Sequence, residues 1–282
     1  MAQSELHPRR YIFRGHANGV SAHIRRPEKH LLPVQGCSSL PVIGGLSESK
    51  VGPNNLDELV SFEAVSTSAH GDYEDAEAGV ATTTGAIAFD VPPTQTTVKS
   101  EVKGLVILGR VHVGRAAVGL ISHSPKGKEQ PEIHLEGNVL EGVRIDDSRL
   151  VVTLAEDFYR VCNTKDKLAK AHAAGLPPEH AHLLMPLDGS AGPATTFPEA
   201  NGTVKCTIVK EIHWDGDPHP TATIHGHVVR VPNFGKIYFG ELYITGDSRR
   251  LTMVRFQLGS PQGGEVVAAE GETNGTTWPP GG

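Results

Sequence analysis

Residues 203–260 constrain the fold more strongly than any other part of this sequence. They read as four β-rich runs separated by three short turns, at residues 215–218, 232–235 and 246–248. Glycine and asparagine adopt positive φ at little cost and proline presets φ, so such residues between β-branched runs mark hairpin turns. The stretch therefore predicts a meander of four antiparallel strands.

Long apolar runs earlier in the chain also predict strands. Residues 98–123 hold one or two of them, with a glycine at every fifth position from Gly104 to Gly119. Apolar runs without strict alternation are typical of strands buried on both faces, and glycine inside a strand indicates a bend or bulge. This segment therefore predicts a curved sheet.

Two further hairpins are predicted from their turn residues. Residues 10–26 contain Asn18-Gly19, and residues 139–154 contain an Asp-Asp-Ser turn at 146–148. Each turn lies between runs of strand-forming residues, which is the usual arrangement of a β-hairpin.

One short helix is predicted, over residues 164–174. Asn163 is a suitable N-cap, Leu168 and Ala171 supply an apolar stripe, and Gly175 followed by two prolines ends the helix. Taken together, these patterns predict an all-β protein, an antiparallel sandwich or distorted barrel with one short helix.

Residues 176–202 are rich in proline, glycine, histidine and threonine, and they predict a loop or linker. Such a linker would separate a β-rich N-terminal region (residues 1–175) from a C-terminal β-meander (residues 203–282). The alternative is one compact unit crossed by a long loop, because all-β chains of this length are often single domains.

The charge balance gives some indication of partners. The chain carries 26 Lys and Arg against 32 Asp and Glu, a net charge of −6, which argues against a general nucleic-acid binder. Basic residues gather within residues 1–30 and acidic ones within residues 259–282. A basic arm could meet the acidic tail of a neighbouring subunit, or both segments could be solvated.

The three cysteines, Cys37, Cys162 and Cys206, form no Cys-x-x-Cys pair and no disulfide framework. We expect buried apolar thiols in a reducing compartment. No secretion signal and no apolar run long enough to span a bilayer is apparent, so the sequence predicts a cytoplasmic protein with no membrane partner.

The densest group of possible metal ligands lies within the predicted meander. Neutral imidazole and carboxylate bind Zn, Fe, Ni and Mn, and in an extended chain residues at period two point to one side. If the first turn joins neighbouring strands, these side chains gather near one end of a sheet and could hold a divalent transition metal. The candidate ligands are His213, Asp215, Asp217, His219, His225 and His227.

The pair His225 and His227 resembles the opening of the cupin metal motif. Val231 and Pro232 stand where that family has a glutamate, so the resemblance assigns no family. The alternative interpretation is that all six residues are solvated turn and edge residues.

Two other groups of side chains are candidates for ligand binding. The acidic residues Asp72, Glu74, Asp75 and Glu77 could bind Ca²⁺, but they lack the EF-hand spacing, so a solvated loop is the preferred interpretation. Residues 236–258 concentrate large side chains in two strands, and these predict a core face rather than an exposed contact surface. They are Tyr238, Phe239, Tyr243, Met253 and Phe256.

Two classes of function remain. The first is a non-enzymatic β-rich binding or assembly protein, a homo-oligomer built through strand edges and loops, whose small-molecule or protein ligand the sequence does not identify. The alternative is a metal-dependent enzyme that uses the histidines as ligands and Asp215 or Asp217 as ligand or general base.

Overall fold

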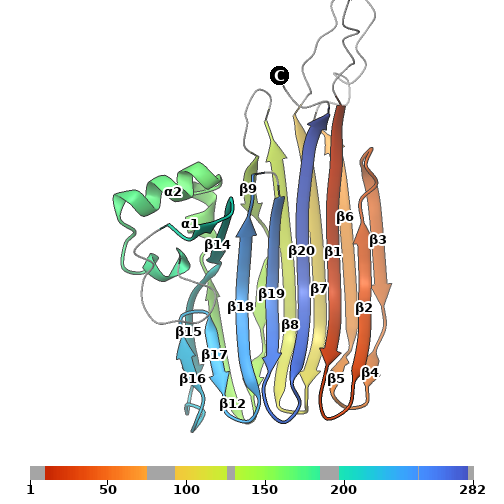
Figure 1. Cartoon of the computed structure of the whole chain (residues 1–282), viewed down its shortest axis with the longest axis vertical. Helices are drawn as coiled ribbons and strands as arrows, with labels where there is room; N and C mark the ends of the chain where they lie inside the picture. Colours follow the sequence, from red (N-terminus) through yellow and green to blue (C-terminus); the bar gives the residue numbers. More distant parts are fainter. Residues whose placement is uncertain (1–9, 75–92, 126–130, 185–196, 247, 279–282) are drawn as a thin grey trace, which may run out of the picture.

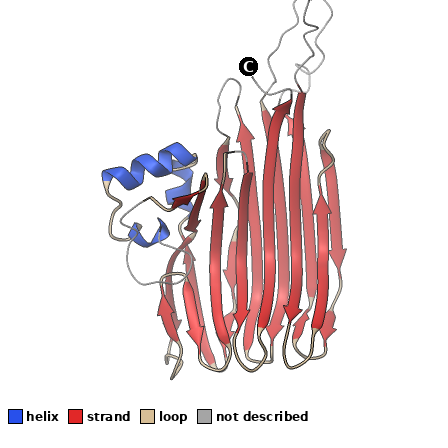
Figure 2. Cartoon of the chain, viewed as in Figure 1, coloured by secondary structure: helices blue, strands red, loops and turns tan. Residues whose placement is uncertain are grey.

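The computed structural model describes residues 10–74, 93–125, 131–184, 197–246 and 248–278. They form two antiparallel sheets that pack face to face (Figure 1). Each sheet keeps free edges, so the fold is the predicted antiparallel sandwich and not a closed barrel. Strands dominate and the helices lie at one side (Figure 2).

The first sheet, called sheet A, contains nine strands among the described residues. Their spatial order is β13 (Glu199–Ala200), β14 (Thr203–Thr207), β18 (Gly235–Ile244), β19 (Ser248–Leu258), β20 (Gly264–Trp278), β1 (Arg10–Ile24) and β2 (His30–Ser39). The short strand β17 (Val228–Val231) pairs with β18, and β16 (Thr223–His225) pairs with β17.

The second sheet, called sheet B, contains eleven described strands. Its main order is β15 (Val209–Asp215), β12 (Ser148–Leu154), β11 (Val143–Ile145), β8 (Val111–Ser124), β7 (Thr94–Ile107), β5 (Val60–Phe62) and β4 (Asn54–Leu56). Beside this order, β6 (Ala64–Tyr73) pairs with β7 and carries the edge strand β3 (Gly45–Val51), while β9 (Glu132–Leu135) and β10 (Val139–Glu141) pair with β8.

Apolar side chains from the two inner faces form the core. In β7, burial alternates through Val98 and Val102 and then shifts by one residue, so that Leu105 and Ile107 are buried. The shift occurs at Gly104, whose φ of 62° is open to glycine but unfavourable for other residues. The bend predicted from the glycine spacing is therefore present at this position.

The large side chains of residues 236–258 mostly pack into the protein, as predicted. Phe239, Met253 and Phe256 are fully buried, Tyr238 is nearly so, and Tyr243 is half-buried.

Three predicted turns are confirmed. Residues 146–148 join β11 to β12, and residues 232–235 join β17 to β18. The third turn, predicted at 246–248, lies between the paired strands β18 and β19, with Asp247 outside the described residues. Asp146 and Asn233 adopt positive φ in the first two turns, which is the conformation expected of such residues there.

The predicted hairpin in residues 10–26 is wrong, because β1 is one continuous strand. Asn18 pairs with Cys37 on one side and Glu270 on the other. Gly19 serves close packing instead of a turn, since a Cβ there would collide with Val65 Cγ1 in the opposite sheet.

The hairpin predicted about residues 215–218 is also wrong. β15 pairs with β12 in sheet B, whereas β16 pairs with β17 in sheet A. The chain already changes sheet at Ile208, between β14 and β15, and the segment after Asp215 returns to sheet A. Turn residues indicate a reversal of direction, but they do not indicate which sheet receives the next strand.

The predicted helix is present as α2 (Lys165–Ala174), but Thr164 caps it in place of Asn163. Thr164 Oγ1 accepts a hydrogen bond from the backbone N of Lys167 at 3.2 Å, and Gly175 ends the helix. The sequence did not reveal α1 (Glu156–Val161) or the 3₁₀ turn η1 (Ala181–Leu184). The short helix α1 has no side-chain cap that a sequence pattern could report.

Strands that precede residues 176–202, the predicted linker, share sheets with strands that follow them. β1 and β2 share sheet A with the C-terminal strands, and β12 pairs with β15 in sheet B. The basic and acidic segments also meet inside one chain, because β1 pairs with β20 along its whole length.

Two of the three cysteines are buried as expected. Burial raises the pKa of the Cys206 thiol to about 12 and also raises that of Cys162. The prediction was wrong for Cys37, which is exposed on the edge strand β2. None of the helices in the described segments has the length and apolar character needed to cross a membrane.

Candidate metal centre

Two histidines and a glutamate meet where β8 ends and β9 begins. His123 lies near the end of β8 and pairs with Glu132, the first residue of β9, while His134 follows two positions later. Residues two apart in a strand share one face. Ile133 between them is fully buried, so Glu132 and His134 lie on the outer face of sheet B.

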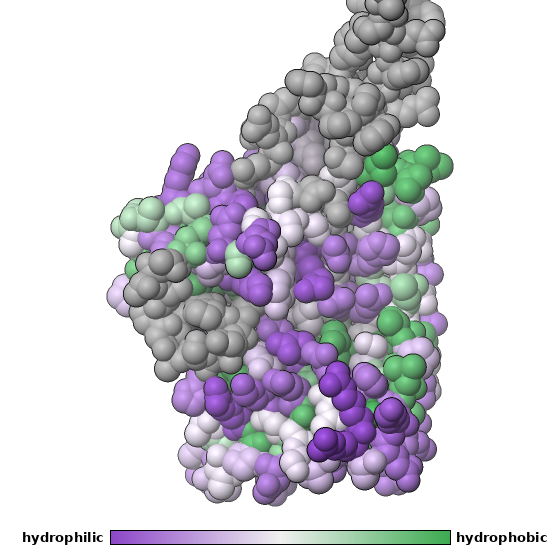
Figure 3. Space-filling view, in the orientation of Figure 1, coloured by the Kyte–Doolittle hydropathy of each residue, from purple (hydrophilic) through white to green (hydrophobic). Residues whose placement is uncertain are grey.

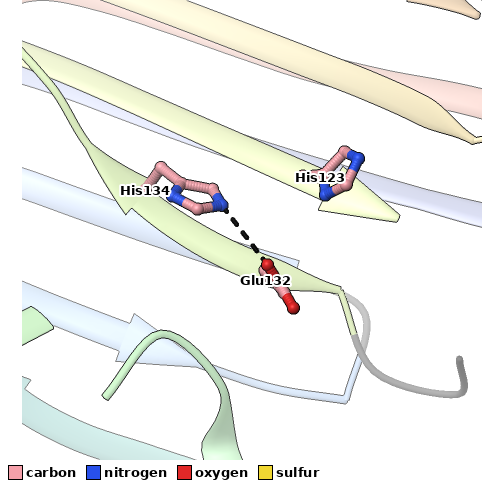
Figure 4. A group of neighbouring side chains, drawn as sticks. All are labelled: His123, Glu132 and His134. Atoms are coloured by element: carbon pink, nitrogen blue, oxygen red, sulfur yellow. Dashed lines mark ion pairs between the residues drawn. The ribbon is translucent and has the colours of Figure 1, made fainter. Parts of the chain in front are cut away.

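The three side chains can each offer one ligand atom, and these atoms all lie within 4.8 Å of one another. Figure 4 shows the His134 ring directed at Glu132, and the Nε2 to Oε2 distance is 3.7 Å. The His123 ring turns one nitrogen toward the other two residues and one away from them (Figure 4). Within the described segments this is the only such group of three or more His, Cys, Asp or Glu residues.

The chemistry of the set suits a transition metal. Two imidazoles with one carboxylate form a recurrent ligand set for divalent metals, and three protein ligands leave coordination positions for water or substrate. All three side chains are partly buried, so they are neither fully solvated nor sealed from solvent.

Neighbouring polar groups contact the three residues. Oε1 of Glu74, the residue after β6, lies 2.7 Å from Nε2 of His123, although the contact is not aligned as a hydrogen bond. Asn163 donates from Nδ2 to Oε2 of Glu132 at 3.3 Å, and Lys167 Nζ donates to Oδ1 of Asn163 at 2.7 Å. Metal sites commonly use such outer partners to orient their ligands.

The segment between α1 and α2 holds β9 in place. The backbone N of Ile133 donates to the carbonyl of Asn163 at 2.5 Å, on the residue whose side chain contacts Glu132. Asn163 therefore contacts β9 through both its backbone and its side chain.

The sequence model of a family described as a domain of unknown function, DUF8256, matches residues 11–174 and 189–245. These two ranges cover well over half of the chain. The chain belongs to the DUF8256 family. No curated protein and no solved structure matches it. The three candidate ligands of this DUF8256 chain, with Glu74 and Asn163, all lie within the first matched range.

The metal ligands predicted from the sequence of this DUF8256 chain lie in several places. His213 and Asp215 are exposed on β15 in sheet B, and Asp217 is exposed in the segment that follows. The ring nitrogen Nδ1 of His213 lies 3.9 Å from Oε1 of Glu211, which is also exposed.

His219 is buried and both its ring nitrogens are engaged. Nε2 lies 2.9 Å from Oδ2 of Asp146, and Nδ1 accepts hydrogen bonds from the backbone N of Thr221 and Ala222. The Trp214 ring stacks against it, with the two ring planes 27° apart. His219 therefore connects loops and has no free ring nitrogen for a metal.

His225 and His227 lie in sheet A, at the β16–β17 turn. His225 is exposed, whereas His227 is buried and its pKa is lowered to about 4, chiefly by burial and then by Arg255 and His182. The structure thus does not bring the six predicted residues into one group of ligands.

One sequence signal could have identified the DUF8256 cluster. Glu132 and His134 are two residues apart, the same spacing as that of His213 and Asp215. His123 joins them only through the pairing of β8 with β9. Of the acidic residues considered for Ca²⁺, Asp72 and Glu74 lie on or beside β6, while Asp75 and Glu77 fall outside the described residues.

Proposed function

We propose that this DUF8256 chain binds a divalent transition metal ion through His123, Glu132 and His134. The observation that carries the proposal is the meeting of two imidazoles and one carboxylate, from two paired strands, within 4.8 Å. The outer contacts from Glu74 and Asn163 support it, because ligands held by partners lose less freedom on binding the ion.

The proposal places metal-dependent chemistry at β8 and β9 instead of residues 203–231. A set of three protein ligands suits a catalytic centre better than a structural one, since structural zinc sites usually have four. An ion bound there would have room for a water molecule and would lower its pKa, which provides a hydroxide near neutral pH. The reaction class that we propose is therefore metal-assisted addition of water.

The test compares metal binding in four single variants. His123→Ala and His134→Ala remove proposed ligands, while His213→Ala and His225→Ala remove exposed histidines elsewhere. After chelation, each protein is titrated with Zn²⁺, Mn²⁺ and Ni²⁺ and analysed by elemental mass spectrometry. We expect about one ion per chain in the wild type and both controls, and little in the two ligand variants.

Thermal unfolding of the same proteins provides an independent measurement, because an ion bound only by the native state raises Tm. Equal Tm values for the metal-free variants would establish that they remain folded. Loss of binding in the controls, or retention in His123→Ala and His134→Ala, would overturn the proposal.

A second candidate function, self-association, is favoured by the surface of one edge. Of the seven large hydrophobic side chains exposed among the described residues, five belong to β2, β3 and the connection between them. They are Leu31, Val34, Val42, Ile43 and Leu46. Figure 3 shows apolar groups along the side where β2 and β3 lie in Figure 1. β2 and β3 are also edge strands, whose unpaired backbone groups can pair with a second copy.

Light scattering across a concentration series tests this candidate. Ile43→Ser with Leu46→Ser should shift a dimer toward monomer, whereas Val161→Ser on α1, which is 72% exposed, should not. A wild type that stays monomeric at every concentration would rule the candidate out.

A further inference from the structure

A cavity of about 410 Å³ opens where two hairpin turns of sheet A lie side by side. One turn joins β1 to β2 and the other joins β19 to β20, and the pairing of Ile24 with Gly264 brings them together. Both lie at the lower end of the sandwich in Figure 1, on the other sheet from the candidate metal centre and far along the strands from it.

Backbone contacts fix the walls of this cavity. The backbone N of Arg25 donates to the carbonyl of Gly263 at 2.8 Å, and the backbone N of Gly263 donates to the carbonyl of Gly259 at 2.8 Å. The aliphatic part of Arg26 passes beside Gly263, about 3.9 Å from where a Cβ would stand. Backbone contact therefore joins the two turns, and the shape of the cavity does not depend on side chains alone.

Positive charge dominates the lining. Arg25, Arg26 and Arg255 face the cavity together with one acidic residue, Glu265. Arg255 donates from Nε and Nη2 to both carboxylate oxygens of the buried Glu241, at 2.6 and 2.7 Å, and from Nη1 to Glu265 at 3.3 Å. The two nearby carboxylates are thus already engaged by Arg255.

Among the described residues, no acidic side chain balances the positive charges of the remaining two arginines. Within the segments that the structure describes, the side chains of Arg25 and Arg26 have no acidic partner and no hydrogen bond, although they line the same cavity. Both side chains are exposed at the mouth of the cavity, and an anion bound between them would reduce the repulsion between their like charges.

We propose that this cavity binds the phosphate or sulfate group of a ligand, at a site separate from the metal centre. The planar guanidinium groups of Arg25 and Arg26 match the oxygens of such a group and can donate two hydrogen bonds each. Ser260 and Gln257, which also line the cavity, provide hydroxyl and amide donors. The proposed ligand is therefore a phosphate or sulfate ester, and it needs no metal ion.

Titration with inorganic phosphate and with sulfate tests the site. Chelator is present throughout, and chloride at equal ionic strength is the reference, so that binding to a metal ion and general screening do not contribute. The double variant Arg25→Gln/Arg26→Gln is compared with Arg144→Gln, which removes an exposed arginine of β11 in the other sheet. We expect wild type and Arg144→Gln to bind, and the double variant to bind at least about ten-fold more weakly.

A second experiment distinguishes a soluble ester from a lipid headgroup as the molecule that carries the phosphate group. Sedimentation with phosphatidylcholine vesicles, with and without phosphatidic acid, is measured for the same proteins. Binding of free phosphate alone indicates a soluble ester, and binding to the acidic vesicles indicates a lipid headgroup. Either result supports the site if the double variant loses it. Absence of binding in both arms, or equal binding by the double variant, would overturn the proposal.

Discussion

Nε2 of His219 and Nε of Arg110 both lie 2.9 Å from the carboxylate of Asp146, each from a different oxygen atom. Arg110 adds a second contact through Nη2 at 2.8 Å. This arrangement connects the β7–β8 turn, the β11–β12 turn and the segment before β16. The backbone also joins the first two turns, because the N of Asp146 donates to the carbonyl of Arg110 at 2.7 Å. The histidine that the period-two spacing predicted as a metal ligand instead contacts Asp146.

The first prediction concerns acid stability at Asp146. The hydrogen bond from Arg110, followed by that from His219, lowers the pKa of Asp146 from 3.8 to about 2. Because the folded pKa lies below the unfolded one, the stabilisation is complete above pH 4 and is lost as the pH falls toward 2. Asp146 is 35% exposed, so we expect Asp146→Asn to cost only about 1 kcal/mol at pH 7.

Urea unfolding at a series of pH values measures this effect. The free energy of unfolding of Asp146→Asn should depend less on pH between 2 and 4 than that of the wild type. Asp157→Asn, whose partner Arg160 is also exposed, is the matched control. An unchanged pH profile for Asp146→Asn would show that the contact contributes nothing in solution.

The second prediction concerns the buried His227. Its folded pKa of about 4 lies below the ordinary 6.5, so between these values the unfolded chain binds more protons than the native one. The free energy of unfolding should therefore rise as pH increases from 4 to 6.5, by at most about 3 kcal/mol. His227→Leu should remove most of this rise, whereas His225→Leu at an exposed position should leave it unchanged. An equally steep rise of the unfolding free energy in His227→Leu would mean that other titrating groups cause it.

The sequence predicted local structure better than the pairing of distant segments. Alternation and turn residues correctly placed the turns at 146–148 and 232–235, because these depend on a few adjacent residues. The prediction of a turn at Gly19 was wrong, because a glycine is needed there for a different reason. A Cβ at this position would collide with Val65 in the opposite sheet. The pattern also could not show that the chain changes sheet at Ile208, because an inward residue looks the same in either sheet.

The same limit explains why the sequence did not predict the candidate metal centre. Period two places residues on one face, but a metal centre also needs a third ligand from a neighbouring strand. His123 reaches Glu132 by the pairing of β8 with β9, which the sequence did not predict. His213 and Asp215 share the spacing, yet β12 lies beside them and provides Val151 opposite His213.

The third prediction concerns the outer contacts of the metal centre. Glu74→Gln and Asn163→Ala should each lower metal affinity by about 10- to 100-fold without changing the number of ions bound at saturation. The reason is that His123 and Glu132 lose the groups that hold them, while the ligand atoms remain. Isothermal titration of the metal-free proteins measures this, with Asp72→Asn, an exposed residue of β6, as control. Wild-type affinity in both variants would mean that the two contacts do not support the ligands.

The fourth prediction concerns Gly119 in β8. A Cβ at this position would collide with the carbonyl oxygen of Glu136, just after β9, and Asn138 bonds both backbone groups of Gly119. Since backbone must move, we expect Gly119→Ala to cost about 1–3 kcal/mol of unfolding free energy and to weaken metal binding by displacing β9. Gly246→Ala, which meets nothing within 4 Å, should be close to neutral. Gly119→Ala with wild-type stability would mean that this close approach is absent in solution.

Anomalous scattering from crystals of the metal-loaded protein tests the central claim most directly. Data collected at the absorption edge of the bound metal locate the ion independently of any assumed ligand. We predict one strong peak between His123, Glu132 and His134, at about 2.0–2.2 Å from a ring nitrogen of each histidine and from a glutamate oxygen. A peak beside His213 or His225 instead, or a metal-loaded crystal without density at β8 and β9, would contradict the assignment.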